Sequence, residues 1–160
     1  MSFPLSIVLF ATSIALERKA VQFRAANPAE MKSVAQRLAA EISPPLLVTL
    51  SGELGAGKTT LVREVLTAWG IAGANSPTFN LRNDYSRAGI RVIHLDFYRL
   101  KPGDAADDIL PPDEDYTDAV VFAEWPEKMP IGLSYLFSRK AELKISGSGD
   151  DVREIDWRPA

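Results

Sequence analysis

Apolar runs and turn-forming residues divide this chain into predicted strands and helices. Residues 46–50 and 119–123 are continuous apolar runs, as in strands that are buried on both faces of a sheet. Residues 79–85 and 90–97 alternate apolar with polar side chains on either side of a turn at residues 86–89. This pattern predicts an antiparallel hairpin whose second strand can also join the parallel sheet.

Two further segments carry apolar residues at helical spacing. In the first, Asn27 is placed as a helix N-cap, Pro28 occupies the first helical position and Glu30 completes a capping box. The second helix is predicted over residues 60–69. The remaining predicted elements are a short strand at residues 21–23, a short acidic helix at residues 102–110, and a C-terminal hairpin of residues 140–145 and 152–157.

Residues 52–59, between the strand at 46–50 and the helix at 60–69, read Gly-Glu-Leu-Gly-Ala-Gly-Lys-Thr. They match the phosphate-binding pattern G-x-x-x-x-G-K-[ST] at every required position. The glycines let backbone amides approach an anion closely, and the positive end of the following helix faces that anion. We therefore expect nucleotide phosphates to be bound by Glu53, Leu54, Gly55, Ala56, Gly57, Lys58, Thr59 and Thr60.

Lys58 and Thr59 have separate roles in this prediction. Lys58 is expected to be an exposed charge that is directed at the β- and γ-phosphates, and the Thr59 hydroxyl is a hard oxygen ligand suited to Mg²⁺. In nucleotide hydrolases a carboxylate at the end of a later strand holds the metal directly or through water. Asp96 and Glu124 both follow apolar strands, so this pattern does not distinguish between them as the direct ligand.

Composition excludes several other functions. The chain has 160 residues, of which 46% are apolar and 24% charged, as expected for one soluble globular domain. Its net charge of −3 argues against a domain that binds nucleic acid by itself. It has no cysteine, which excludes disulfides and cysteine nucleophiles and fits a cytoplasmic location. His94 is the only histidine, and no catalytic triad or further zinc ligand accompanies it; it is either an interior residue or part of the site.

Residues 52–60, 76–85, 94–100 and 124–127 form four sequence blocks, the third reading His-Leu-Asp-Phe-Tyr-Arg-Leu and the fourth Glu-Trp-Pro-Glu. In their order and spacing these blocks resemble the TsaE family (formerly YjeE), bacterial ATPases needed for threonylcarbamoyladenosine modification of tRNA. The resemblance implies an α/β protein with a three-layer α/β/α P-loop nucleotide-binding fold and a mixed, mainly parallel central sheet. It also implies weak ATP hydrolysis that is stimulated in a complex with TsaB and TsaD.

The same resemblance implies roles for single residues. Thr59 and Glu124 correspond to the Mg²⁺ pair, Lys58 binds phosphates, and Asp96 acts through water. Thr78 corresponds to a switch residue that senses the γ-phosphate of ATP, whereas a plain structural interpretation is that its hydroxyl caps the hairpin. TsaD transfers the threonylcarbamoyl group to the tRNA adenosine beside the anticodon, so tRNA would be contacted only through the partners.

Two other functions are compatible with a phosphate-binding loop. A small-molecule kinase usually needs a lid with several arginines, but residues 101–118 contain no arginine and are acidic, as in a solvated face. A nucleotide-dependent interaction module without useful turnover would need no acceptor pocket. Measuring ATP hydrolysis with and without the partners distinguishes these alternatives from a partner-stimulated ATPase.

The N-terminus contains a mostly apolar segment, residues 3–16, that resembles the hydrophobic core of a signal peptide. It lacks a preceding positive region, charged residues 17–19 follow it, and it is too short to span a bilayer. We expect residues 1–20 to be an N-terminal extension and residues 21–160 to be a P-loop ATPase domain without membrane association.

Overall fold

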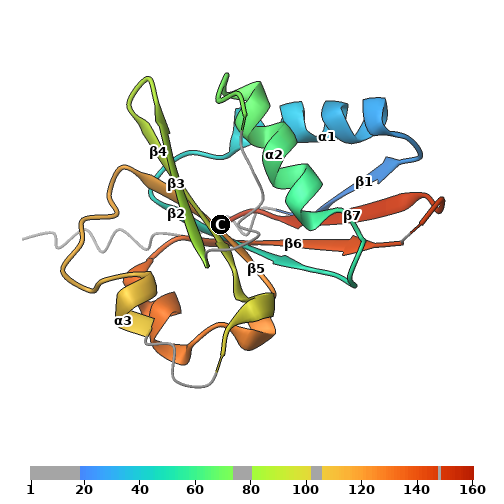
Figure 1. Ribbon diagram of the computed structural model, residues 1–160. Helices are drawn as coiled ribbons and strands as arrows, with labels where there is room; N and C mark the ends of the chain where they lie inside the picture. The colour runs from blue at the N-terminus through green and yellow to red at the C-terminus, as the bar shows by residue number, and fades with distance from the viewer. Residues whose placement is uncertain (1–18, 74–80, 102–105, 148) are drawn as a thin grey trace, which may run out of the picture.

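The computed structural model describes residues 19–73, 81–101, 106–147 and 149–160 (Figure 1). The described helices are α1 (Pro28–Glu41), α2 (Lys58–Ala68) and α3 (Ala106–Ile109), with 3-10 helices η1 (Phe97–Arg99), η2 (Pro126–Lys128) and η3 (Ile131–Leu136). The strands are β1 (Val21–Ala25), β2 (Leu46–Ser51), β3 (Arg82–Arg87), β4 (Ile90–Asp96), β5 (Ala119–Glu124), β6 (Lys140–Ser146) and β7 (Arg153–Arg158). None of these helices is long and apolar enough to cross a bilayer.

The strands form one mixed sheet in the order β1-β7-β6-β2-β5-β4-β3. The four central strands β6, β2, β5 and β4 are parallel, whereas the pairs β1–β7, β7–β6 and β3–β4 at the two edges are antiparallel. The predicted hairpin is confirmed, although β3 continues through Arg87 into the predicted turn, and its second strand, β4, does join the parallel sheet beside β5. The register pairs Asp96 with Glu124, so both carboxylates lie at the carboxyl edge of the sheet.

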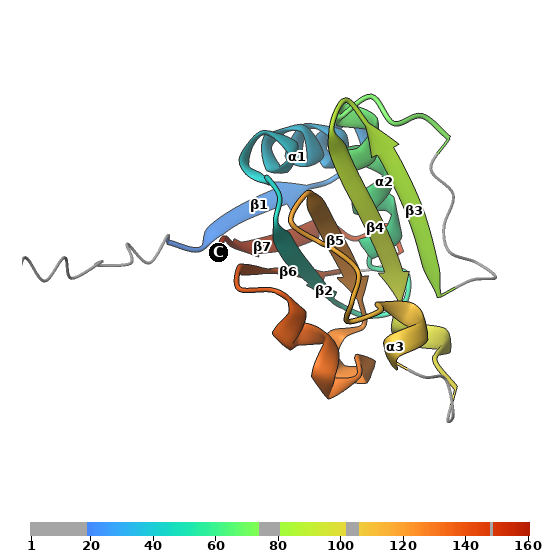
Figure 2. The ribbon, with the colours of Figure 1, turned by 90° about the vertical axis from the view of Figure 1, so that its left-hand side faces the viewer.

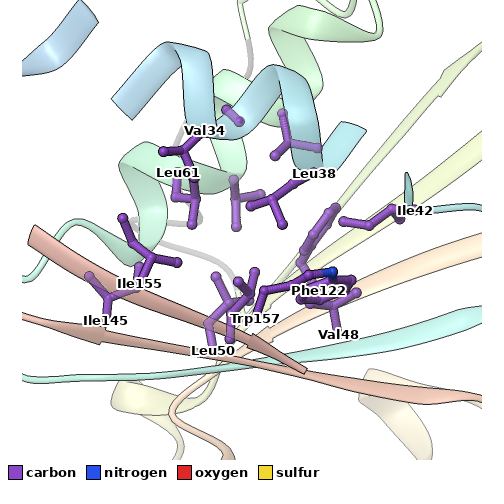
Figure 3. Close-up of a cluster of buried hydrophobic side chains, with 14 of the residues drawn as sticks. Val34, Leu38, Ile42, Val48, Leu50, Leu61, Phe122, Ile145, Ile155 and Trp157 are labelled. Carbon is purple, nitrogen blue, oxygen red and sulfur yellow. The ribbon is translucent and has the colours of Figure 1, made fainter. Parts of the chain in front are cut away.

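Helices α1 and α2 cover one face of this sheet, and α3 with the 3-10 helices covers the other (Figures 1 and 2). The first face buries the larger core, in which Leu38, Phe122 and Trp157 are fully enclosed (Figure 3). The second core contains Val121, on the face of β5 opposite Phe122. The three-layer α/β/α fold is therefore confirmed. Its second layer consists of short helical segments because prolines interrupt this part of the chain, namely Pro111, Pro112, Pro126 and Pro130.

The acidic segment after α3 differs from the expected solvated face at one residue. Glu114 receives hydrogen bonds from Arg82 on β3, at 2.8 and 3.0 Å, and from Arg91 on β4. Arg82 also pairs with Asp84, 2.7 Å away. Most other acids of the segment are exposed, but Glu114 joins it to the β3–β4 hairpin.

The predicted N-cap of α1 is present, but the carboxylate that should complete the capping box accepts from Ala26, one residue before the N-cap, and not from the Asn27 backbone. The Asn27 side chain accepts the Glu30 N–H at 3.0 Å, and the Glu30 carboxylate accepts the Ala26 N–H at 2.8 Å. The apolar face of the helix then buries Met31, Val34, Ala35 and Leu38. The cap therefore fixes the start of α1 where the chain leaves β1.

We expect Asn27→Ala to lower the free energy of unfolding by about 1 kcal/mol, because the Glu30 N–H loses its acceptor. Ser33→Ala is the matched control on the exposed side of the same helix, and it should change stability by less than about 0.5 kcal/mol. Urea unfolding followed by circular dichroism measures both. Equal effects of the two substitutions would contradict a capping role for Asn27.

Candidate phosphate-binding site

The loop between β2 and α2 has the backbone of an anion cradle. Gly57 is the N-cap of α2 with a φ of 102°, and Gly52 has a φ of 148°, conformations that residues with a Cβ rarely adopt. A Cβ on Gly52 would overlap the carbonyl oxygen of Ile145 on the neighbouring strand β6. The loop is thus pressed against the sheet, and the first amides of α2 face outward from its positive end.

Lys58 is buried, so the expectation that its charge is exposed is wrong. Its side chain is 4% exposed, and Nζ donates to the carbonyl oxygens of Gly52 at 2.6 Å and Glu53 at 2.9 Å. The Trp125 ring covers the ammonium, with 3.9 Å between Nζ and the ring centroid. Burial lowers the pKa of Lys58, and nearby carboxylates, foremost that of Glu124, oppose this by raising it.

A chain of side-chain hydrogen bonds joins the loop to the sheet. The Thr59 hydroxyl donates to Oε2 of Glu124 at 3.0 Å, and Oε1 of Glu124 lies 2.8 Å from Nε2 of His94. Glu124 is 2% exposed and His94 is fully buried. Three elements therefore meet at one carboxylate: the start of α2, the end of β5 and the interior of β4.

Asp96 lies beside Glu124 but has a different partner. Its carboxylate accepts the Tyr98 N–H at 3.0 Å and caps η1. Burial raises the pKa of Asp96; the Tyr98 N–H opposes this shift, and the negative charge of Glu124 adds to it. Of the two candidate acids, the structure brings Glu124 to Thr59, which the sequence pattern alone did not decide.

Trp125 and Tyr98 form an aromatic cover over this end of the site. Their ring centroids are 4.9 Å apart, and Lys128 donates to the Tyr98 carbonyl at 3.1 Å. Trp125 has a left-handed backbone with a φ of 59°, which is uncommon for a bulky residue and points to a function. Sequence reasoning missed its contact with Lys58, although a tryptophan directly after the acid was the available signal.

A cavity of about 420 Å³ opens on the other side of the loop. It lies between the start of α1, the loop and the β6–β7 turn, and its walls include Asn27, Met31, Gly57 and Thr60. Arg153, which sequence reasoning also missed, closes it by donating to the carbonyl oxygens of Ala56 at 3.0 Å and Gly149 at 2.8 Å. The predicted switch residue Thr78, with residues 76–79, lies outside the described part of the chain.

The sheet order, the glycine loop and the helix that starts at Lys58 define an α/β protein of the P-loop class. Residues 25–155 match the family model described as threonylcarbamoyl adenosine biosynthesis protein TsaE, and the chain belongs to this family.

Two curated relatives illustrate the match, both described as tRNA threonylcarbamoyladenosine biosynthesis protein TsaE. The Bacillus subtilis protein is 33% identical over 140 residues, covering 87% of this chain and 85% of the relative. The Streptomyces coelicolor protein is 40% identical over 129 residues, covering 78% and 87%. The crystal structure of Bacillus subtilis YdiB superposes with a TM-score of 0.63 at 29% identity, covering 88% of this chain and 86% of that one.

Gly52→Ala should destabilise the protein more than Gly55→Ala does. Both glycines have positive φ, but a Cβ on Gly55 meets nothing within 4 Å, whereas one on Gly52 meets the backbone of β6. We expect Gly55→Ala to cost about 1–2 kcal/mol from backbone conformation alone, and Gly52→Ala to cost clearly more in urea unfolding. Equal losses would show that the loop does not depend on its contact with β6.

Proposed function

We propose that this chain is an ATP-binding and ATP-hydrolysing subunit that acts on a TsaB–TsaD complex in threonylcarbamoyladenosine modification of tRNA next to the anticodon. Membership of the TsaE family supports the role in this biosynthesis. The observation that carries the ATPase part is the 3.0 Å hydrogen bond between Thr59 and Glu124. It places a loop hydroxyl beside a strand-end carboxylate, the two kinds of group that hold Mg²⁺ in P-loop hydrolases. In this proposal residues 21–160 form the ATPase domain.

The loop residues supply the contacts for the phosphates. The amides of residues 53–60 and the start of α2 would bind the phosphate oxygens. Lys58 already lies at the inner side of this loop, where its ammonium satisfies the carbonyls of Gly52 and Glu53. A phosphate anion is a stronger acceptor than these neutral carbonyls, so Lys58 would turn to the β- and γ-phosphates when ATP binds.

The chemistry of the donors fits Mg²⁺. Thr59 and Glu124 offer a hydroxyl and a carboxylate oxygen, which are the hard ligands that this ion prefers, and both are held by a shared hydrogen bond. Bound Mg²⁺ neutralises negative charge on the phosphate oxygens. Asp96, one strand away and level with Glu124, would act through water rather than as a direct ligand.

The cavity beside the loop would receive the base and ribose. Its volume of about 420 Å³ lies within the usual range for small-ligand sites. Met31 and Pro28 give it apolar surface, while Asn27 and Thr60 supply polar atoms. The start of α1 therefore lies beside the proposed nucleotide base.

Family membership suggests the protein partners, and the net charge of the chain bears on whether it contacts tRNA directly. We infer that hydrolysis is weak in the isolated chain and rises in the complex with TsaB and TsaD, with Thr78 reporting the γ-phosphate to them. The net charge of −3 gives the chain little capacity to release counterions from RNA, so tRNA would be contacted through the partners. We place this work in the cytoplasm.

Glu124→Gln should reduce Mg²⁺-dependent ATP hydrolysis by about tenfold or more, because an amide is a poorer metal ligand and cannot accept on both atoms. ADP affinity without Mg²⁺ should stay near that of the wild type, since the loop amides are unchanged. Asp96→Asn is the matched control and should keep its Mg²⁺ dependence. If only Asp96→Asn lost the Mg²⁺ dependence, Asp96 would be the direct metal ligand and Glu124 would act through water.

Reconstitution tests the function as a whole. ATP hydrolysis is measured for the chain alone and after addition of TsaB and TsaD, with Lys58→Ala as the variant that should remove stimulation through lost nucleotide affinity. We expect several-fold stimulation of the wild type only. A wild-type rate that the partners leave unchanged would argue against the proposal, and phosphate transfer to a small acceptor would favour a kinase.

A further inference from the structure

We propose that His94 is a positioning residue for Glu124: its Nε2–H fixes the glutamate so that the second carboxylate oxygen faces Thr59 and the metal side of the site. This inference rests on the proposed function, because it gives His94 a purpose only if Glu124 acts at a nucleotide site. His94 is an interior residue and at the same time a direct neighbour of the candidate metal ligand, two interpretations that the sequence left open.

The sheet places the two side chains on one face. His94 follows Val92 at the strand period of two, and Glu124 follows Phe122 in the same way; Val92 and Phe122 both belong to the core under α1 and α2. In the parallel register His94 is level with Phe122, so Glu124 is its diagonal neighbour. The imidazole thus reaches Oε1 of Glu124 at 2.8 Å from within the core.

The hydrogen-bond partners of the His94 imidazole determine which of its two nitrogens carries the hydrogen. A carboxylate only accepts, so Nε2 must be the donor towards Glu124. Nδ1 is buried and has no hydrogen-bond partner among the described residues. An N–H there would be a buried donor without an acceptor, which is more costly than an unused lone pair. The geometry therefore favours the Nε2–H tautomer.

Packing alone does not account for a histidine at this position. The side chain is fully buried on the face of the sheet that α1 and α2 cover, where an aliphatic residue would fill the space without an unpaired polar atom. What an aliphatic residue cannot supply is a donor to Glu124. With Thr59 on Oε2 and His94 on Oε1, the carboxylate is held at both oxygens before any ligand binds.

The tautomer is directly measurable because the chain contains one histidine. The full chain labelled with ¹⁵N at histidine gives a single imidazole in a long-range ¹H–¹⁵N spectrum. We expect the Nε2–H pattern in the wild type. An Nδ1–H pattern would overturn the proposal, since Nε2 could then not donate to Glu124.

Two variants separate positioning from packing. His94→Gln keeps a side-chain N–H donor with similar reach, whereas His94→Leu fills the core without a donor. Calorimetry measures affinity for a non-hydrolysable ATP analogue with Mg²⁺ and, separately, with EDTA. We expect His94→Leu to lose about tenfold in affinity with Mg²⁺ and to match the wild type in EDTA, and His94→Gln to recover most of that loss.

Other outcomes count against the proposal in distinguishable ways. Equal losses in Mg²⁺ and EDTA, or equal behaviour of the two variants, would show His94 to be a core residue only. A wild type whose affinity does not depend on Mg²⁺ would contradict the proposed function itself. Thermal unfolding checks that both variants fold. If His94→Leu does not fold, the test rests on the tautomer and on His94→Gln, whose affinity with Mg²⁺ should stay near that of the wild type.

Discussion

The buried carboxylate of Glu124 is the constraint on which the arrangement of this site depends. A carboxylate that is 2% exposed is costly unless its oxygens are hydrogen-bonded. Here one oxygen accepts from Thr59 and the other lies against His94, while the positive charge of Lys58 is close enough to be affected by it. Because each partner comes from a different element, α2, β4 and β5 must keep their relative positions for the Glu124 carboxylate to keep its hydrogen bonds.

The parallel centre of the sheet makes this meeting possible. Strands β2, β5 and β4 run in the same direction, so their carboxyl ends, with the loop after β2, open at one edge. The chain must turn sharply after β5, and Trp125 adopts a left-handed backbone there that costs about 1–3 kcal/mol. Its ring contacts Lys58 and Tyr98, so the strained turn also places the cover over the Lys58 ammonium.

Local signals in the sequence predicted the elements well, and long-range contacts account for what they missed. The phosphate loop, the α1 cap and the apolar run of β5 are each encoded by adjacent residues, and the structure contains all three. The choice between Asp96 and Glu124 depends on the strand order, because β5 adjoins β2 and its loop whereas β4 lies one strand further away, and identical strand-end patterns cannot reveal that order. Lys58 is likewise covered by Trp125, and Arg153 donates to the carbonyl of Ala56; both contacts join residues that are far apart in sequence.

The acidic segment after α3 contacts the β3–β4 hairpin, whose second strand contributes to the site. Glu114 holds Arg82 and Arg91, whose side chains are only 20% and 26% exposed, so these pairs are less screened than surface pairs. Beside the β3–β4 turn, Arg87 donates to the carbonyl of Gly70, just after α2. Strand β4 lies between β3 and β5, and it carries both His94 and Asp96. The hairpin that contains the strand carrying His94 is therefore joined both to the segment after α3 and to the end of α2.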